Sequence, residues 1–202
     1  DLGYFELSMA RDPRPIIIHE GVPGHYYQMA LSWANPNPIR RRFIDSGANE
    51  GIAFYVEELL MRAGLFDFSP RSREIIYSYM RLRALRVEID IRLAVGDFTI
   101  EQAGEYLARA VPMDRETAVQ EAVFFAFNPG QAISYQIGKL QVLRFLADAK
   151  LDQGEEFVPY QVGLCLLSRL NAKPQSTDVN ANPGEAPERR RPEHPIQPPC
   201  QR

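Results

Sequence analysis

The chain has 202 residues, of which 45% are apolar, and this is enough to form the core of one domain. Its formal net charge of −3 gives no basic surface for a nucleic acid. No apolar run approaches the roughly 20 residues of a membrane-spanning helix. The chain begins without Met or a signal-peptide pattern, so we interpret it as part of a longer protein whose localisation is unknown.

Prolines limit where helices can form in the first 38 residues. Residues 1–15 contain two X-Pro pairs and predict an extended lead-in, because a residue before proline is disfavoured in a helix. A helix is expected to begin at Ile16 and to be interrupted by Pro23-Gly24. It resumes over 26–33 and ends at the Asn-Pro repeat of 35–38.

The rest of the chain predicts further helices and no strand, because no segment alternates apolar and polar residues. Capping signals mark several starts: Asn49, Ser69 followed by Pro70, the box Thr99 to Gln102, and Asp114. The expected helices are 49–63, 69–95, 99–110, 114–127 and 131–149, with a weaker apolar segment at 157–170. The fold class is therefore all-α.

The composition changes near residue 172 to Pro, Asn, Glu and Arg. Such a segment cannot bury enough apolar surface to offset the entropy lost on ordering. We therefore divide the chain into a helical domain at 1–171 and a disordered tail at 172–202.

Two of the three histidines, His19 and His25, lie close together, and Glu20 follows the first. In the zinc helix His-Glu-x-x-His, histidines four residues apart share one face and the glutamate lies beside the metal-bound water. Here the separation of six residues places the histidines about 120° apart on an unbroken helix. A bulge at Pro23-Gly24 would return His25 to the face of His19, and Glu20 would be the general base.

A catalytic zinc site needs a third protein ligand. Glu50, expected on the first turn of the next helix, is the best candidate, and Gly51 beside it allows another backbone to approach. Glu57 and Glu58 are competitors. Glu57 shares the face of Glu50, so it is also a candidate to orient a ligand histidine by a hydrogen bond.

Simpler interpretations exist for each of these residues. His19 and His25 could be packed histidines beside a helix kink, and the glutamates could be the solvated face of an amphipathic helix. For Tyr135 the corresponding interpretation is a buried tyrosine packed beside Pro129-Gly130.

Three stretches together resemble a bacterial family, domain of unknown function 885, over about residues 10–150. They are His-Glu-x-x-Pro-Gly-His at 19–25, Glu-Gly-Ile-Ala-Phe-Tyr-Val-Glu at 50–57, and Pro-Gly-Gln-Ala-Ile-Ser-Tyr-Gln-Ile-Gly at 129–138. That family is related to gluzincin metallopeptidases. The chain departs from the family pattern at 91–94 and 157–160, where histidines are absent.

The resemblance implies the C-terminal portion of a zincin-like helical catalytic domain, with one Zn²⁺ per chain on His19, His25 and Glu50. Glu20 would activate water for attack on a peptide carbonyl, and Tyr135 would stabilise the oxyanion. Family members are longer, so an N-terminal helical half is expected to be missing here.

Two arginines of the expected long helix, Arg83 and Arg86, match an Arg-x-x-Arg stretch of the family. They are candidates to bind a substrate carboxylate, with ion pairs to Glu88 or Asp90 as the alternative.

The motif and the family resemblance together predict a zinc-dependent peptidase acting on a peptide substrate. Two alternatives stay open: a catalytically inactive metal-binding scaffold and a zinc hydrolase of a non-peptide amide. The sequence does not separate carboxypeptidase, aminopeptidase and oligopeptidase action.

Overall fold

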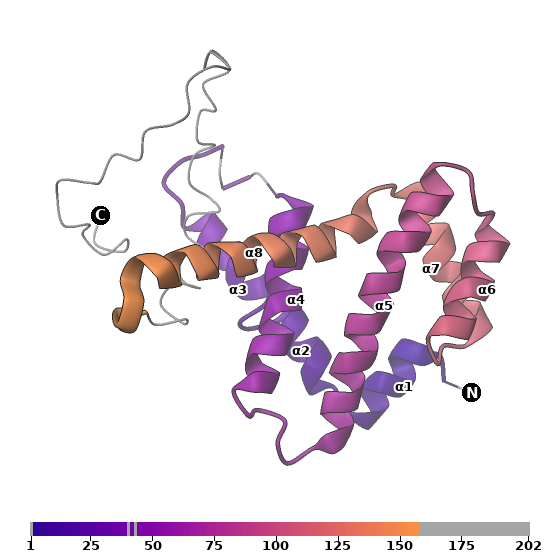
Figure 1. Ribbon diagram of the computed structural model, residues 1–202, viewed down its shortest axis with the longest axis horizontal. Coiled ribbons are helices and arrows are strands. Elements are labelled where there is room, and N and C mark those ends of the chain that lie inside the picture. The colour runs from indigo at the N-terminus through magenta and orange to yellow at the C-terminus, as the bar shows by residue number, and fades with distance from the viewer. Residues whose placement is uncertain (1, 40, 43, 158–202) are drawn as a thin grey trace, which may run out of the picture.

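The structure is a computed structural model that describes residues 2–39, 41–42 and 44–157. Within these residues it is all-helical, which confirms the predicted fold class. Figure 1 shows α8 running across one end of α4 and α5, with α6 and α7 beside α5. The helices are α1 (Tyr4–Arg11), α2 (Arg14–Glu20), α3 (His25–Trp33), α4 (Ser46–Arg62), α5 (Pro70–Ala94), α6 (Ile100–Ala110), α7 (Arg115–Phe127) and α8 (Gln131–Gln153), followed by the short 3₁₀ helix η1 (Gly154–Glu156).

Local capping signals place the starts of three helices correctly. Proline is in the first turn of α5, as expected. Thr99 and Gln102 form the predicted capping box of α6. The Asp114 carboxylate accepts a hydrogen bond from the Thr117 N–H at the start of α7.

The extended lead-in predicted for residues 1–15 is wrong, because this segment contains α1 and the start of α2. Pro13 excludes helical dihedral angles at Asp12, and α1 ends at Arg11 directly before it, so the proline ends this helix without preventing it. Contacts with distant residues hold α1 in place. The Tyr4 N–H donates to Asp114 over 2.7 Å, and the Tyr4 hydroxyl lies 2.6 Å from the Ser78 hydroxyl.

The predicted start of α4 is also wrong. The helix begins at Ser46, because Asp45 rather than Asn49 caps it by accepting a hydrogen bond from the Ala48 N–H. Glu50 therefore lies on the second turn of α4 and not on the first. The predicted apolar segment at 157–170, from residue 158 onward, and the predicted disordered tail at 172–202 lie outside the described residues.

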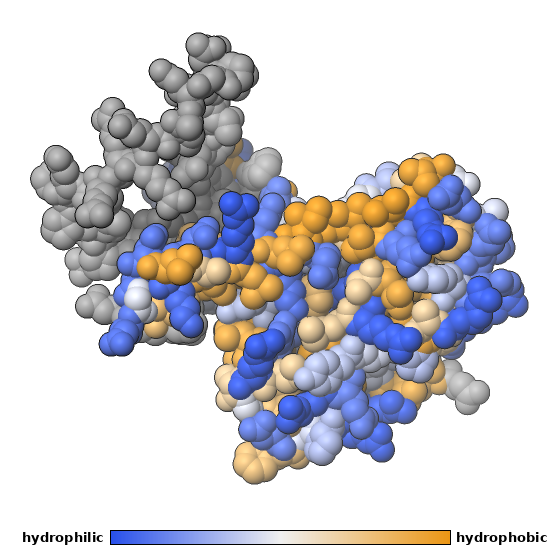
Figure 2. Space-filling view, viewed as in Figure 1, coloured by the Kyte–Doolittle hydropathy of each residue, from blue (hydrophilic) through white to orange (hydrophobic). Residues whose placement is uncertain are grey.

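The largest group of buried side chains surrounds α5. It joins α1, α5, α6, α7 and the start of α8 through residues that include Tyr79, Leu82, Leu107 and Phe125. The outer side of α8 is less well covered, since Ile137 and Leu140 are about half exposed. Figure 2 shows apolar side chains gathered over α8 on the face in view. No helix in the described part of the chain has the length and apolarity to cross a bilayer.

Two glycines let α4 and α8 cross in close contact. A Cβ atom placed on Gly51 would lie 2.3 Å from the backbone of Gly138, and one placed on Gly138 would lie 1.8 Å from the Gly47 carbonyl oxygen. Only residues without a side chain allow this separation. The close approach expected at Gly51 is thus made by α8, the helix that carries Tyr135.

A buried carboxylate fixes the start of α8 against α5. Asp90, near the C-terminal end of α5, accepts hydrogen bonds from the N–H groups of Gly130, Ala132 and Ile133. These N–H groups belong to the first turn of α8 or precede it, where they have no partner within the helix. Asp90 therefore sets the position of α8 relative to the arginines of α5.

Candidate metal centre

The two histidines come from separate helices and not from one bulged helix, so the predicted bulge is wrong. Residues 21–24 connect α2 to α3 and contain a cis Val22–Pro23 bond. Gly24 packs so tightly that a Cβ atom there would lie 1.8 Å from the His19 carbonyl oxygen. The connection therefore folds back on the last turn of α2, and the rings of His19 and His25 meet with centroids 4.7 Å apart.

Glu50 of α4 lies against both histidines. Its Oε2 atom is 3.7 Å from His19 Nε2 and 3.4 Å from His25 Nε2. This oxygen is buried and has no hydrogen-bond partner among the described residues. Ligands bound at about 2.1 Å in a tetrahedron lie about 3.4 Å apart. Both contacts therefore have the length of an edge of a zinc coordination sphere, and the donor set of two imidazoles and one carboxylate suits zinc.

Glu20 is a second carboxylate at the same place. His19, Glu20 and His25 each offer a ligand atom, and these atoms all lie within 4.8 Å of one another. The Glu20 side chain is exposed, whereas the Glu50 side chain is largely buried and has the unpartnered oxygen. This difference favours Glu50 as the ligand and leaves Glu20 beside the site with its carboxylate free.

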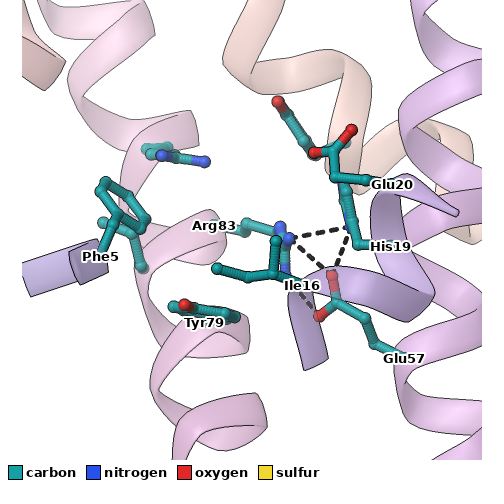
Figure 3. Close-up of a pocket in the computed structure, with 10 residues that line it drawn as sticks. Phe5, Ile16, His19, Glu20, Glu57, Tyr79 and Arg83 are labelled. Atoms are coloured by element: carbon teal, nitrogen blue, oxygen red, sulfur yellow. Dashed lines mark hydrogen bonds and ion pairs between the residues drawn. The ribbon is translucent and has the colours of Figure 1, made fainter. Parts of the chain in front are cut away.

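Glu57 and Arg83 hold the ring of His19 from behind. Glu57 Oε1 lies 2.5 Å from His19 Nδ1, the contact expected for a residue that orients a ligand histidine. Arg83 donates to both carboxylate oxygens of Glu57 over 2.7 Å. Figure 3 shows this arrangement, with Glu57 joined to both His19 and Arg83 by dashed lines.

The arrangement around Glu57 suits the His19 tautomer that binds a metal through Nε2. With Nε2 free to bind a cation, Nδ1 carries the hydrogen and donates it to Glu57. Arg83 lies 3.2 Å from the same nitrogen. Because the Arg83 nitrogen is itself a donor, Glu57 is the acceptor for both groups.

Burial and charge act in opposite directions at these residues. Burial lowers the pKa of His19, but Glu50 and Glu57 outweigh it, so the pKa of His19 is raised. Burial likewise opposes ionisation of Glu50, yet the two histidines outweigh it and lower the pKa of Glu50 to about 2. The carboxylates thus stabilise positive charge between the imidazoles, which is the electrostatic condition for binding a cation.

A cavity of about 180 Å³ opens beside His19. His19 and Glu20 lie at one edge of it, and Phe5 and Tyr79 lie at the other (Figure 3). Tyr135 of α8 also lines the cavity. Burial, followed by the charge of Glu50, raises the pKa of Tyr135 to about 12, so its hydroxyl keeps its proton at neutral pH and can donate a hydrogen bond.

The structure places Arg83 and Arg86 on the cavity wall, each paired with a residue that the sequence did not suggest. Arg83 is buried against Glu57, and Arg86 donates through Nε to Glu121 of α7 over 2.5 Å. Neither pairs with Glu88 or Asp90 within the described residues. Both terminal nitrogens of Arg83 donate to Glu57. Arg86 instead donates to Glu121 through Nε, and its two terminal nitrogens make no hydrogen bond with the described residues.

Sequence reasoning missed two contacts that position the site. Asp90 caps α8 from 40 positions upstream, and Arg83 holds Glu57 across 26 positions. Neither contact has a local sequence signal. The one indirect signal is Gly130, which directly precedes α8, has left-handed dihedral angles and has no side chain to cap the helix.

Comparison with known proteins identifies the family. Residues 13–160, more than half of the chain, match the family described as "Bacterial protein of unknown function (DUF885)". The chain therefore belongs to this family, as its three motifs suggested. It has no significant match among curated proteins.

A solved structure shares this fold. It is described as "The crystal structure of the putative lipoprotein from Colwellia psychrerythraea", with a TM-score of 0.73 and 27% sequence identity. The match covers 77% of this chain and 27% of that chain. The present chain thus spans about a quarter of the length of that protein.

Proposed function

We propose that this domain is a zinc-dependent peptidase of the gluzincin type, with zinc bound by His19, His25 and Glu50. The observation that carries the proposal is the meeting of three ligand atoms from α2, α3 and α4 at edge lengths of 3.4 and 3.7 Å. The unpartnered Oε2 atom of Glu50 supports it, because a buried carboxylate oxygen without a partner is costly unless a cation completes the site.

The residues around the ligands suit hydrolysis of a peptide bond. When bound, zinc polarises the scissile carbonyl and makes water a nucleophile near neutral pH. Glu20 is free to accept the proton of the attacking water and to pass it to the leaving amine. Glu57 holds the proton on His19 Nδ1 and so keeps Nε2 directed at the ligand position.

Tyr135 is proposed to donate a hydrogen bond to the oxyanion that forms during attack. Replacing Tyr135 with Phe removes this donor and is expected to lower kcat/KM by about 100-fold. Zinc content and Tm are expected to stay close to those of the unmodified protein, because the phenyl ring keeps its packing. Steady-state kinetics on one peptide checks this expectation, and unchanged kcat/KM would exclude the role.

Zinc binding and its link to hydrolysis provide the test of the proposed function. We expect about one zinc per chain by mass spectrometry of metals, and loss of at least half of it in His19→Ala, His25→Ala and Glu50→Ala. A chelator should abolish cleavage in a mixed peptide pool, and added zinc should restore it. Full zinc content in the Glu50→Ala variant would instead point to Glu20 as the third ligand.

The same experiment separates the two remaining functions. One zinc per chain without cleavage of any peptide, but with cleavage of small acyl amides, would indicate a hydrolase of non-peptide amides. Zinc without either activity would indicate a metal-binding scaffold.

A further inference from the structure

The charged groups that line the cavity differ in how far their hydrogen-bonding capacity is already used. Both oxygens of Glu57 and both terminal nitrogens of Arg83 are engaged with one another or with His19. The remaining donor of this pair, Arg83 Nε, is buried, so neither residue presents a free charged end to a substrate. Two charged groups of the lining stay available among the described residues: the Glu20 carboxylate and the outer end of the Arg86 guanidinium.

Arg86 is held rigidly, and its two terminal nitrogens are left open. Its Nε donates to Glu121 over 2.5 Å, and both side chains are largely buried. Aromatic rings surround the guanidinium, with Cζ at 5.4 Å from the ring centroid of Phe125 and 5.9 Å from that of Phe5. No hydrogen-bond acceptor in the described part of the chain reaches the terminal nitrogens. This end of the group therefore presents two parallel donors, which match a carboxylate.

Arg86 and the catalytic carboxylate lie on opposite sides of the cavity. Figure 3 places Glu20 and His19 at one edge and Phe5, the neighbour of Arg86, at the other. Tyr135 lies between Arg86 and the histidines. Its ring centroid is 5.7 Å from Arg86 Cζ, and its hydroxyl is close enough to Glu50 for the charge of that residue to raise the pKa of Tyr135. An extended peptide spans about 3.5 Å per residue, so one or two residues lead from a carbonyl group held at Tyr135 to Arg86, whose Cζ is 5.7 Å from the Tyr135 ring centroid.

We propose that Arg86 binds the free C-terminal carboxylate of a peptide, so that the domain removes one or two residues from the C-terminus. This inference rests on the proposed peptidase function and specifies its substrate class. An aminopeptidase would need an unengaged carboxylate to bind the terminal ammonium, and the only such group in the described lining is Glu20, which is assigned to proton transfer. The cavity therefore favours the carboxyl end of a peptide over the amino end.

The first test compares two peptides of one sequence, one with a free C-terminal carboxylate and one with a C-terminal amide. The zinc-loaded protein is expected to release one or two C-terminal residues from the acid, as seen by mass spectrometry. A charge-assisted bidentate contact predicts that kcat/KM for the amide is lower by about 10- to 100-fold. Equal cleavage of both peptides, or cleavage at internal bonds alone, would overturn the inference while leaving the peptidase function intact.

The second test assigns the preference to Arg86. In Arg86→Gln, whose amide can still donate to Glu121, the ratio of acid to amide cleavage is expected to fall below threefold. The matched control is Arg81→Gln, an exposed arginine of the same helix, which should keep the full ratio. A preference that persists in Arg86→Gln would contradict the assignment.

A binding measurement keeps the inference testable if no peptide is cleaved. Calorimetry with zinc-loaded Glu20→Gln measures the Kd of the acid and of the amide without turnover. We expect the acid to bind at least 10-fold more tightly, and this difference should disappear in Glu20→Gln combined with Arg86→Gln. Absence of cleavage with this binding pattern would refute the peptidase function alone, whereas equal affinities would refute the carboxylate site.

Discussion

Replacing Glu20 with Gln is expected to lower kcat/KM for peptide hydrolysis by about 10²- to 10⁴-fold, the usual contribution of a positioned general base. Glutamine has nearly the shape of glutamate but cannot accept the proton of the attacking water. Because Glu50 rather than Glu20 is the assigned ligand, zinc content should stay at that of the unmodified protein. Peptide kinetics and metal analysis on the same preparation provide the two measurements.

The control for Glu20→Gln is the same change at Glu105, an exposed glutamate of α6 that lies outside the cavity lining. This variant should keep normal activity, zinc content and Tm. If Glu20→Gln instead lost its zinc, Glu20 would be a metal ligand and the assignment of Glu50 would fail. If it kept its activity, another group would supply the general base.

Replacing Glu57 with Ala is expected to have the largest effect on stability. The Arg83 guanidinium would stay buried beside His19 with no counter-charge, and breaking a buried ion pair in this way typically costs about 3–5 kcal/mol. The His19 ring would also lose its hydrogen-bond acceptor, which should weaken zinc binding by about 10- to 100-fold. Urea denaturation and zinc titration measure the two losses separately.

A double replacement distinguishes these two roles of Glu57. Glu57→Leu with Arg83→Met removes both charges and keeps apolar volume, so it should recover much of the lost stability. Zinc affinity should stay low, since His19 Nδ1 still lacks its acceptor. Recovery of full zinc affinity in the double variant would show that Glu57 acts only on folding and not on the orientation of His19.

The parts of the fold that the sequence predicted are those with local causes. The starts of α5, α6 and α7 follow from Pro70, Thr99 and Asp114, which act on the turn next to them. The helix α1 was missed because contacts of Tyr4 with residues more than 70 positions away hold it in place. No window of the sequence contains that information.

In the candidate site, too, features with local causes were predicted and features set by distant contacts were missed. Residue types and order were enough to nominate His19, His25 and Glu50, and the structure brings these three together. The path of the backbone between the histidines was predicted wrongly, because proline and glycine mark an interruption without stating its shape. The partner of Arg83 was missed, since helix packing and not sequence spacing brings α5 against α4 at Glu57.

The contact between Gly51 and Gly138 has a consequence for how this domain can change over evolution or in design. Gly51 adjoins Glu50, the proposed metal ligand, and Gly138 lies one turn after Tyr135, so a shift of either helix changes the position of Glu50 relative to Tyr135. Substitutions that widen this crossing would therefore separate the proposed metal ligand from the proposed oxyanion donor. Residues of the opposite cavity wall, such as Phe5, belong to helices outside this contact. We expect new substrate preferences to arise on that wall, while the α4–α8 pair stays fixed.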